Sequence, residues 1–243
     1  MQNPILFLHI TKTAGGTLKS AIKASLKENA LLANGVKDVC RDYTPGQHEV
    51  IFGHFGFGIH VPLGVAPRYM AFLRHPILRT ISHYYHLRNV DKSRIGDLIR
   101  QSTDINDFFE RFSHWEFNDF QCRVLSGKMD AKIEAGRADH LHKLARTNLE
   151  TYFEFCGIQE FFDLSVRSLG NALHRQLKIV KNVNLGTYDI AAISDLTFDR
   201  IIRLNVQDMR LYNRQVGKFV GSLSPAEPAA PSQISGQLPA AAG

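Results

Sequence analysis

The sequence predicts an α/β fold in which a central, mainly parallel sheet is flanked by helices, with a helix-rich C-terminal half. Three short apolar runs, at residues 5–10, 49–53 and 69–73, are rich in β-branched and aromatic side chains and indicate buried strands. The first and third runs pass through a turn into a helical pattern, and strands alternating with helices favour a parallel sheet. From Asp104 onward the apolar spacing is mainly helical.

The other elements follow in chain order. After the first strand, Leu18, Ala21, Ile22 and Leu26 fall on one face of an expected helix. Pro76 suits the first turn of a second helix. Further expected elements are a weak strand over 36–39, a Gly-rich loop over 55–64 that covers a site, helices over 108–112, 118–125 and 139–147, a strand over 153–158, and helices over 160–176 and 195–219.

Length and composition indicate one globular domain. The chain has 243 residues, 44% hydrophobic and 21% charged, as in soluble proteins with a substantial core. We expect this domain over residues 1–220 and a disordered tail over 221–243, where Ser, Pro, Ala and Gln replace any apolar periodicity. No run approaches a membrane span, and the first strand begins too early for a signal peptide, so we expect a cytoplasmic enzyme. The oligomeric state stays open.

Charge and cysteine usage narrow the classes of partner. The net charge of +6 favours an anionic ligand such as a nucleotide or an acidic glycan, although a solvated surface would give the same total. Lys and Arg are scattered without a nucleic-acid motif, so no nucleic acid is expected. Cys40, Cys122 and Cys156 are far apart, which disfavours a disulfide framework or a zinc site.

The turn after the first strand has the composition of an anion-binding loop. Lys12 supplies a positive charge, Thr13 and Thr17 supply hydroxyls, and Gly15 and Gly16 let the backbone approach a phosphate at the start of a helix. An ordinary β–α turn is the alternative interpretation. The loop is not a Walker A motif, in which the lysine follows the glycines.

A second segment repeats this arrangement at the end of the third strand. Arg74 offers a planar fork suited to a phosphate, and Ser82 lies about two turns into the following helix. A magnesium-dependent nucleotidase would usually carry an aspartate at such a strand end. The arginine therefore favours a second phosphate that is held without a metal.

Several segments together resemble the sulfotransferases that use 3′-phosphoadenosine-5′-phosphosulfate (PAPS), in particular the carbohydrate branch that contains heparan sulfate 2-O-sulfotransferase and bacterial relatives. That branch has a 5′-phosphosulfate loop similar to H-I-P-K-T-G-G-T-[ST]-L and a 3′-phosphate segment similar to L-R-D-P-x-x-R-x-x-S-x-Y-Y. The similar segments here are His9 to Leu18, Gly53-His54, Leu73 to Tyr85, Asn118 to Gly127, Phe155 to Phe161 and Asp208 to Tyr212. They occur in the family's order across residues 5–219. Thr11 replaces a proline of the pattern, and His75 replaces an aspartate.

The resemblance implies a P-loop-like three-layer fold and a metal-free sulfuryl transfer from PAPS that leaves 3′,5′-bisphosphoadenosine. Arg74 and Ser82 would bind the 3′-phosphate, and His54 would act as general base toward the acceptor hydroxyl. Lys12 would also stabilise the leaving group. The 5′-phosphosulfate would be held by Lys12, Thr13, Ala14, Gly15, Gly16, Thr17 and Leu18.

The acceptor is implied only as a class. A poly- or oligosaccharide hydroxyl fits the branch, and a lipid-linked or small-molecule alcohol stays open. Candidate acceptor-binding residues are His60 in the Gly-rich loop and Asn118, Gln121 and Arg123, for which surface positions are the alternative. Two other functions also stay open: a nucleotide or small-molecule kinase, which would need a metal carboxylate, and an anion- or glycan-binding module without catalysis.

Overall fold

The computed structural model describes residues 3–90, 93–130, 138–177, 179 and 188–223. Its centre is a five-stranded sheet with the order β2-β3-β1-β4-β5, and every neighbouring pair of strands is parallel. The predicted α/β class with a parallel sheet is confirmed. The strands are β1 (Ile5–Leu8), β2 (Ala30–Ala33), β3 (Val50–Gly53), β4 (Tyr69–Leu73) and β5 (Phe153–Ile158).

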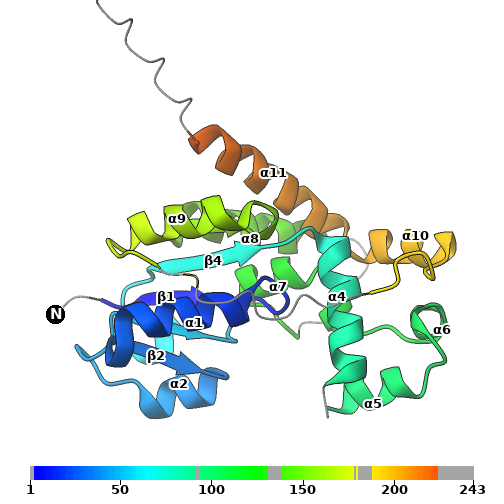
Figure 1. Cartoon of the computed structure of the whole chain (residues 1–243), viewed down its shortest axis with the longest axis horizontal. Coiled ribbons are helices and arrows are strands. Elements are labelled where there is room, and N and C mark those ends of the chain that lie inside the picture. Colours follow the sequence, from blue (N-terminus) through cyan, green and yellow to red (C-terminus); the bar gives the residue numbers. More distant parts are fainter. Residues whose placement is uncertain (1–2, 91–92, 131–137, 178, 180–187, 224–243) are drawn as a thin grey trace, which may run out of the picture.

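Helices cover the sheet and extend beyond one end of it. Figure 1 shows α4 at the end toward which the strands run, with α5, α6 and α10 gathered around it on the side away from the sheet. The helices are α1 (Gly15–Leu26), α2 (Val36–Asp42), α3 (His60–Leu63), α4 (Pro76–Asn89), α5 (Arg94–Arg100), α6 (Ile105–Arg111), α7 (Phe120–Ser126), α8 (Ala138–Tyr152), α9 (Phe162–Ala172), α10 (Asp195–Leu204) and α11 (Val206–Ser222).

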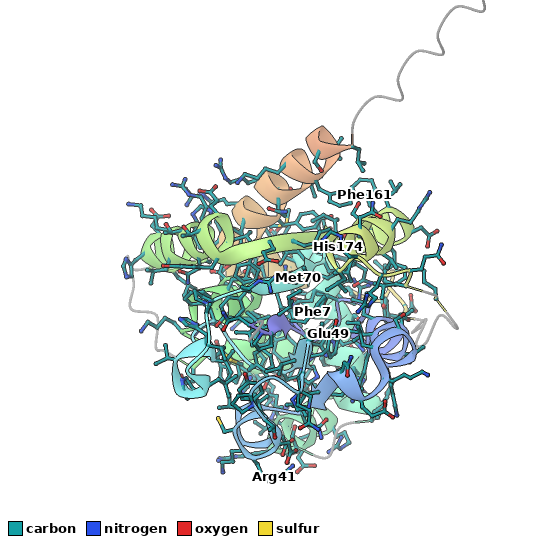
Figure 2. The ribbon with its side chains drawn as sticks, turned by 90° about the vertical axis from the view of Figure 1, so that its left-hand side faces the viewer. Phe7, Arg41, Glu49, Met70, Phe161 and His174 are labelled. Atoms are coloured by element: carbon teal, nitrogen blue, oxygen red, sulfur yellow. The ribbon has the colours of Figure 1, made fainter. Side chains whose placement is uncertain are left out.

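Alternate strand residues face two separate cores, which makes the molecule three-layered. Leu6 and Leu8 of β1 belong to the cluster formed with α7, α8 and α11, whereas Phe7 of β1 and Met70 of β4 belong to the cluster formed with α1 and α9. In Figure 2 Phe7 and Met70 lie near the middle of the molecule, while Arg41 of α2 lies at its margin. Both faces of the sheet are therefore buried, as continuous apolar strands require.

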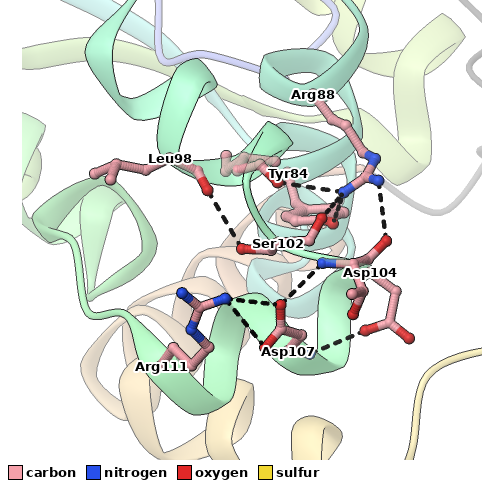
Figure 3. A network of polar contacts seen from close by, with 9 residues as sticks. Tyr84, Arg88, Leu98, Ser102, Asp104, Asp107 and Arg111 are labelled. Carbon is pink, nitrogen blue, oxygen red and sulfur yellow. Dashed lines mark hydrogen bonds and ion pairs between the residues drawn. The ribbon is translucent and has the colours of Figure 1, made fainter.

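A third core supports α4, the helix that follows Arg74. Ile81 and Tyr84 of α4 pack with residues of α5, α6 and α10. Arg88 of the same helix donates hydrogen bonds to the Tyr84 hydroxyl at 2.9 Å and to the carbonyl oxygens of Ser102 at 3.1 Å and Thr103 at 3.0 Å. Figure 3 shows Arg88 directed toward Tyr84 and Ser102. A charged donor on these two carbonyl oxygens fixes the α5–α6 connection against α4.

The weak strand expected over residues 36–39 is wrong, because this segment is the helix α2. The strand of this region is β2, in which Ala30 pairs with Val50 and Ala33 pairs with Gly53. The valines at 36 and 39 suggested β structure, but only Val39 is buried, and the Asp38 carboxylate accepts a hydrogen bond from the Asn34 N–H. Pairing with β3 decides the location of the strand, which overrides the low β propensity of residues 30–33.

Two boundaries near the C-terminus also differ from expectation. The single helix over 195–219 is divided at Asn205, whose buried side chain donates to the carbonyl oxygens of Phe117 and Ile201 at 3.1 and 2.9 Å. The side chain of Asn205 thus competes with helix continuation. Helix α11 runs through Ser222 into the expected tail, and residues 224–243 of that tail lie outside the described part. Within the described residues no helix combines the length and apolar character needed to cross a membrane.

Candidate active site

The carboxyl ends of the parallel strands open into a cavity of about 640 Å³. This edge is where open α/β sheets bind their ligands. The cavity brings together Lys12 after β1, His54 after β3, and Arg74 and Ser82 around the start of α4. Its lining consists of His9, Thr11, Lys12, Ala14, Gly15, Gly16, Thr17, His54, Arg74, Ser82, His86, Gln159, Glu160, Phe162 and Asp163.

The loop between β1 and α1 directs a helix N-terminus into the cavity. No side chain caps α1 and its first turn holds no acidic residue, so its positive end is directed toward the space lined by Gly15, Gly16 and Thr17. Lys12 and Ala14 both adopt left-handed backbone conformations, with φ of 70° and 62°. That conformation costs about 1–2 kcal/mol for a residue other than glycine. The tight turn therefore stores strain beside the proposed anion site.

Two members of the predicted phosphate loop do not line the cavity. The Thr13 hydroxyl is buried and donates to the Ile10 carbonyl oxygen at 2.8 Å, so it closes the turn from inside. The Leu18 side chain is fully buried in the core beneath α1, and the Leu18 N–H donates to the Ala14 carbonyl oxygen at 3.2 Å. Thr13 and Leu18 thus shape the loop from inside, and their side chains do not reach a ligand in this arrangement.

His54 has a defined tautomer. Its Nδ1 lies 2.9 Å from the carbonyl oxygen of His9. A carbonyl oxygen can only accept, so Nδ1 carries the proton and Nε2 of the neutral ring keeps its lone pair. The packing of protein around the ring lowers the pKa of His54, the hydrogen bond to His9 opposes this, and the charge of Lys19 lowers it further. Although the residue keeps an exposed surface, its imidazole is held neutral and ready to accept a proton at Nε2.

His9 contributes to the site, although sequence reasoning assigned it no role. Its ring centroid lies 4.1 Å from that of His54, and an added Cβ at Gly15 would collide with the His9 ring. Burial, followed by the charges of His54, Lys19 and Lys12, lowers the pKa of His9 to about 3. Its position at the start of the loop motif from His9 to Leu18 was the sequence signal that could have identified it as a site residue. The glycine at position 15 is required because the imidazole occupies the space of a side chain.

We expect acid to destabilise the protein through His9. The pKa of His9 is about 3 in the folded protein and about 6.5 in the unfolded chain, so the unfolded chain binds the proton first as the pH falls. The contribution of neutral His9 to the free energy of unfolding is therefore fully present above pH 6.5 and decreases as the pH falls toward 3. Between pH 7 and 5 the loss should be about 2 kcal/mol. Urea unfolding at both pH values measures it, and His9→Phe, which keeps a ring but cannot titrate, should show a smaller pH dependence. Equal pH dependence in both proteins would contradict this assignment.

Arg74 links the loop before α1 to Tyr188 and, through it, to Ser82 of α4. Its Nη1 donates to the carbonyl oxygen of Lys12 at 3.1 Å, and its Nη2 donates to the Tyr188 hydroxyl at 3.3 Å, which in turn donates to Ser82 Oγ at 3.3 Å. No side chain caps α4, and Pro76 occupies its first turn without an acidic residue. Arg74 and Ser82 therefore place a guanidinium and a hydroxyl on the same cavity that the N-terminus of α1 faces.

Gln121 supports Arg74 from behind and does not line the cavity. Its side-chain Oε1 accepts from the Arg74 N–H at 3.0 Å, and its Nε2 donates to the Arg74 carbonyl oxygen at 2.9 Å. The residue is almost fully buried. The expectation that Gln121 contacts the acceptor is therefore corrected: the residue sets the backbone position of Arg74.

Two buried aspartates fix the helix that carries Gln121. Asp208 of α11 accepts hydrogen bonds from the backbone N–H groups of Gln121 at 2.9 Å and Cys122 at 2.7 Å, at the start of α7. Asp119, before α7, accepts from the N–H groups of Gln207 at 2.8 Å and Asp208 at 3.0 Å, at the start of α11. Burial raises the pKa of both carboxyls, and the neighbouring Asp208 adds to the rise at Asp119. Asp208 thus caps α7, the helix that follows Asp119, and Asp119 caps α11, the helix that contains Asp208.

Replacing Gln121 with leucine tests this support. The Arg74 backbone N–H and carbonyl would both lose a buried partner, and each unsatisfied group costs about 1–3 kcal/mol. We expect a fall of about 2–5 kcal/mol in the free energy of unfolding, measured by urea denaturation. Gln101→Leu, at an exposed position outside the cavity lining, is the matched control and should lie near the wild type. A Gln121→Leu protein as stable as the control would contradict the support of the Arg74 backbone by Gln121.

The structure places the remaining acceptor candidates away from the cavity. His60 lies in α3, and its Nδ1 is 2.7 Å from the Tyr69 hydroxyl at the start of β4, the opposite end from Arg74. Arg123 is buried and donates from Nε to the Asn118 carbonyl oxygen at 2.7 Å, and its Nη2 lies 3.5 Å from Asn118 Oδ1. The grouping of these residues in the sequence therefore reflects internal support and not a shared substrate surface.

Glu160 supplies an acidic group next to His75, and His75 stands where the family pattern has an aspartate. Its carboxylate lines the cavity, accepting from the His75 N–H at 2.9 Å through Oε1 and from the Tyr212 hydroxyl at 2.9 Å through Oε2. The His75 ring meets Tyr212 edge to face at 5.5 Å. Across the described ranges, no group of three or more His, Cys, Asp or Glu side chains is arranged to hold a metal ion.

Comparison with solved structures finds this fold in a sulfotransferase. The mouse sulfotransferase SULT7A1, complexed with PAP, aligns with a TM-score of 0.51 and 12% sequence identity, over 91% of this chain and 89% of that chain. At this identity the likeness concerns the fold: the chain has the P-loop-like α/β architecture of a sulfotransferase. No protein-family model matches the sequence, and no curated protein matches it.

Proposed function

We propose that the protein is a PAPS-dependent sulfotransferase that transfers a sulfuryl group to a hydroxyl of an acceptor. The observation that carries this proposal is one cavity that meets the uncapped N-terminus of α1 beside Lys12 and, at a separate place, Arg74 and Ser82. Two separate anion sites with a cation each suit a nucleotide phosphorylated at both its 5′ and 3′ positions. The PAP-bound sulfotransferase of similar fold adds support.

PAPS would supply the activated sulfuryl group, and 3′,5′-bisphosphoadenosine would be the product released. The residues fit such a ligand, because the first turn of α1 and the loop before it present donors and no acidic side chain. Lys12 would hold the 5′ end and stabilise charge that develops on the leaving oxygen. Burial lowers the pKa of Lys12, and Arg74 lowers it further while Tyr188 opposes. Arg74 and Ser82 would hold the 3′-phosphate.

His54 would act as the general base. Its neutral ring presents Nε2 with a free lone pair, since Nδ1 is engaged with the His9 carbonyl oxygen. We propose a carbohydrate hydroxyl as the acceptor, on the resemblance of the loop and strand-end motifs to the carbohydrate branch. The order of the strands places His54 after β3 on one side of β1, and Arg74 after β4 on the other. The acceptor would therefore enter from the β3 side.

A ligand-induced shift in melting temperature tests the donor. A sulfotransferase of this kind should be stabilised by 3′,5′-bisphosphoadenosine far more than by ATP with magnesium. The opposite preference would favour a kinase, and a response to neither would favour a binding module. Transfer of radiolabelled sulfate from PAPS to a panel of glycans and small alcohols then identifies the acceptor. Labelling of small alcohols alone would overturn the carbohydrate assignment.

A further inference from the structure

Tyr188 joins the two groups proposed to bind the 3′-phosphate. Its hydroxyl accepts from Arg74 Nη2 at 3.3 Å and donates to Ser82 Oγ at 3.3 Å. No other tyrosine hydroxyl shares these partners among the described residues. The Tyr188 oxygen thus stands where an acceptor atom can meet a guanidinium and a serine hydroxyl together. Those are the contacts that a phosphate oxygen would make.

The surrounding structure holds the Tyr188 ring in place. It stacks on Tyr85 of α4, with ring centroids 5.7 Å apart and an angle of 22° between the planes. The following residue, Asp189, accepts from the N–H groups of Ala191 at 3.0 Å and Ala192 at 3.3 Å through Oδ1, which closes a turn. The hydroxyl is therefore presented by a fixed ring, and its proton can change direction by rotation about the C–O bond alone.

The electrostatic environment makes this hydroxyl a strong donor. Burial raises the pKa of Tyr188, but the hydrogen bonds with Ser82 and Arg74 and the charges of Arg74 and Lys12 outweigh it, so the pKa is lowered. A more acidic phenol donates a stronger hydrogen bond to an anion.

We propose that Tyr188 is a third ligand of the 3′-phosphate and sets the preference for 3′-phosphorylated nucleotides. This inference rests on the proposed function. With the nucleotide bound, Arg74 and Ser82 turn their donors to the phosphate, and the Tyr188 proton turns from Ser82 to a phosphate oxygen. All three donors then come from different parts of the chain: the end of β4, the second turn of α4 and the segment before α10. A nucleotide without the 3′-phosphate gains nothing from this hydroxyl.

Tyr188→Phe removes the hydroxyl and keeps the stacked ring. Isothermal titration with 3′,5′-bisphosphoadenosine and with adenosine 5′-monophosphate gives the ratio of the two dissociation constants. We expect Tyr188→Phe to reduce the preference for the bisphosphate about tenfold or more, with the monophosphate affinity unchanged. Tyr85→Phe is the matched control, because its hydroxyl lies 3.5 Å from the Asp189 carbonyl oxygen and should not affect the ratio. Melting temperatures verify that both variants are folded.

The outcomes separate this inference from the function on which it rests. A wild-type protein that binds both nucleotides equally would overturn the proposed donor and, with it, the role of Tyr188. A wild type that prefers the bisphosphate, with an unchanged ratio in Tyr188→Phe, would overturn only the role of Tyr188. A higher ratio in Tyr188→Phe would also overturn it, because the hydroxyl would then obstruct the phosphate. A loss for both nucleotides alike would indicate a structural role and would likewise overturn the assignment.

Discussion

His54→Ala is expected to lose at least about 100-fold in the rate of sulfuryl transfer while keeping its affinity for 3′,5′-bisphosphoadenosine. The imidazole is positioned by the His9 carbonyl oxygen at 2.9 Å and presents Nε2 as the only ring nitrogen able to accept a proton. Positioned general bases contribute about 10²–10⁴-fold. Single-turnover transfer rates, together with product titration, measure the two quantities separately.

His60→Ala is the matched control for this experiment. It removes a histidine of α3 that contacts Tyr69 at the start of β4 and does not line the cavity, so transfer should continue near the wild-type rate. The pKa of His54 is lowered from 6.5, so the ring is neutral above that pH, and the wild-type rate should fall only below it as the base takes a proton. A folded His54→Ala protein with a near wild-type rate would remove His54 as the base.

The double variant Arg74→Ala, Ser82→Ala is expected to weaken the binding of 3′,5′-bisphosphoadenosine by at least about 100-fold. Hydrogen bonds to a charged group are each worth about 1.5–3 kcal/mol, and both residues are assigned to the 3′-phosphate. The loss should be concentrated in the bisphosphate, because adenosine 5′-monophosphate lacks the group they bind. Isothermal titration with both nucleotides measures the difference.

Arg111→Ala controls for the loss of one positive charge. Arg111 lies in α6, outside the cavity lining, and pairs with Asp107 at 3.1 Å in the network of Figure 3. Nucleotide affinity should not change in this variant. The double variant loses one further contact, because Arg74 also donates to the Lys12 carbonyl oxygen. An unchanged affinity in the folded double variant would exclude the 3′-phosphate assignment, whereas an equal loss in Arg111→Ala would assign the effect to overall charge.

Local sequence patterns were sufficient to predict the strands whose burial alone dictates an apolar sequence. Apolar runs predicted β1, β3, β4 and β5, because a strand buried on both faces must be apolar throughout. Lys12, His54 and Arg74 each follow such a run closely, and they lie at one edge because parallel strands end together. The segment of β2 was missed because Ala30–Ala33 lacks a β-branched residue and is defined by pairing with β3.

The sequence by itself determined the α/β class, the glycine-rich turn after β1, and the positions of His54 and Arg74 at strand ends, because each depends on residues that are neighbours in the chain. Only the tertiary structure decided which polar side chains face the cavity. Gln121 is directed to the Arg74 backbone, 47 residues away, and Tyr188 reaches Arg74 across 114 residues. No local periodicity encodes such contacts. They arise when α11 packs against α4 and α7, when α10 packs against α4, and when each buried polar group must find a partner.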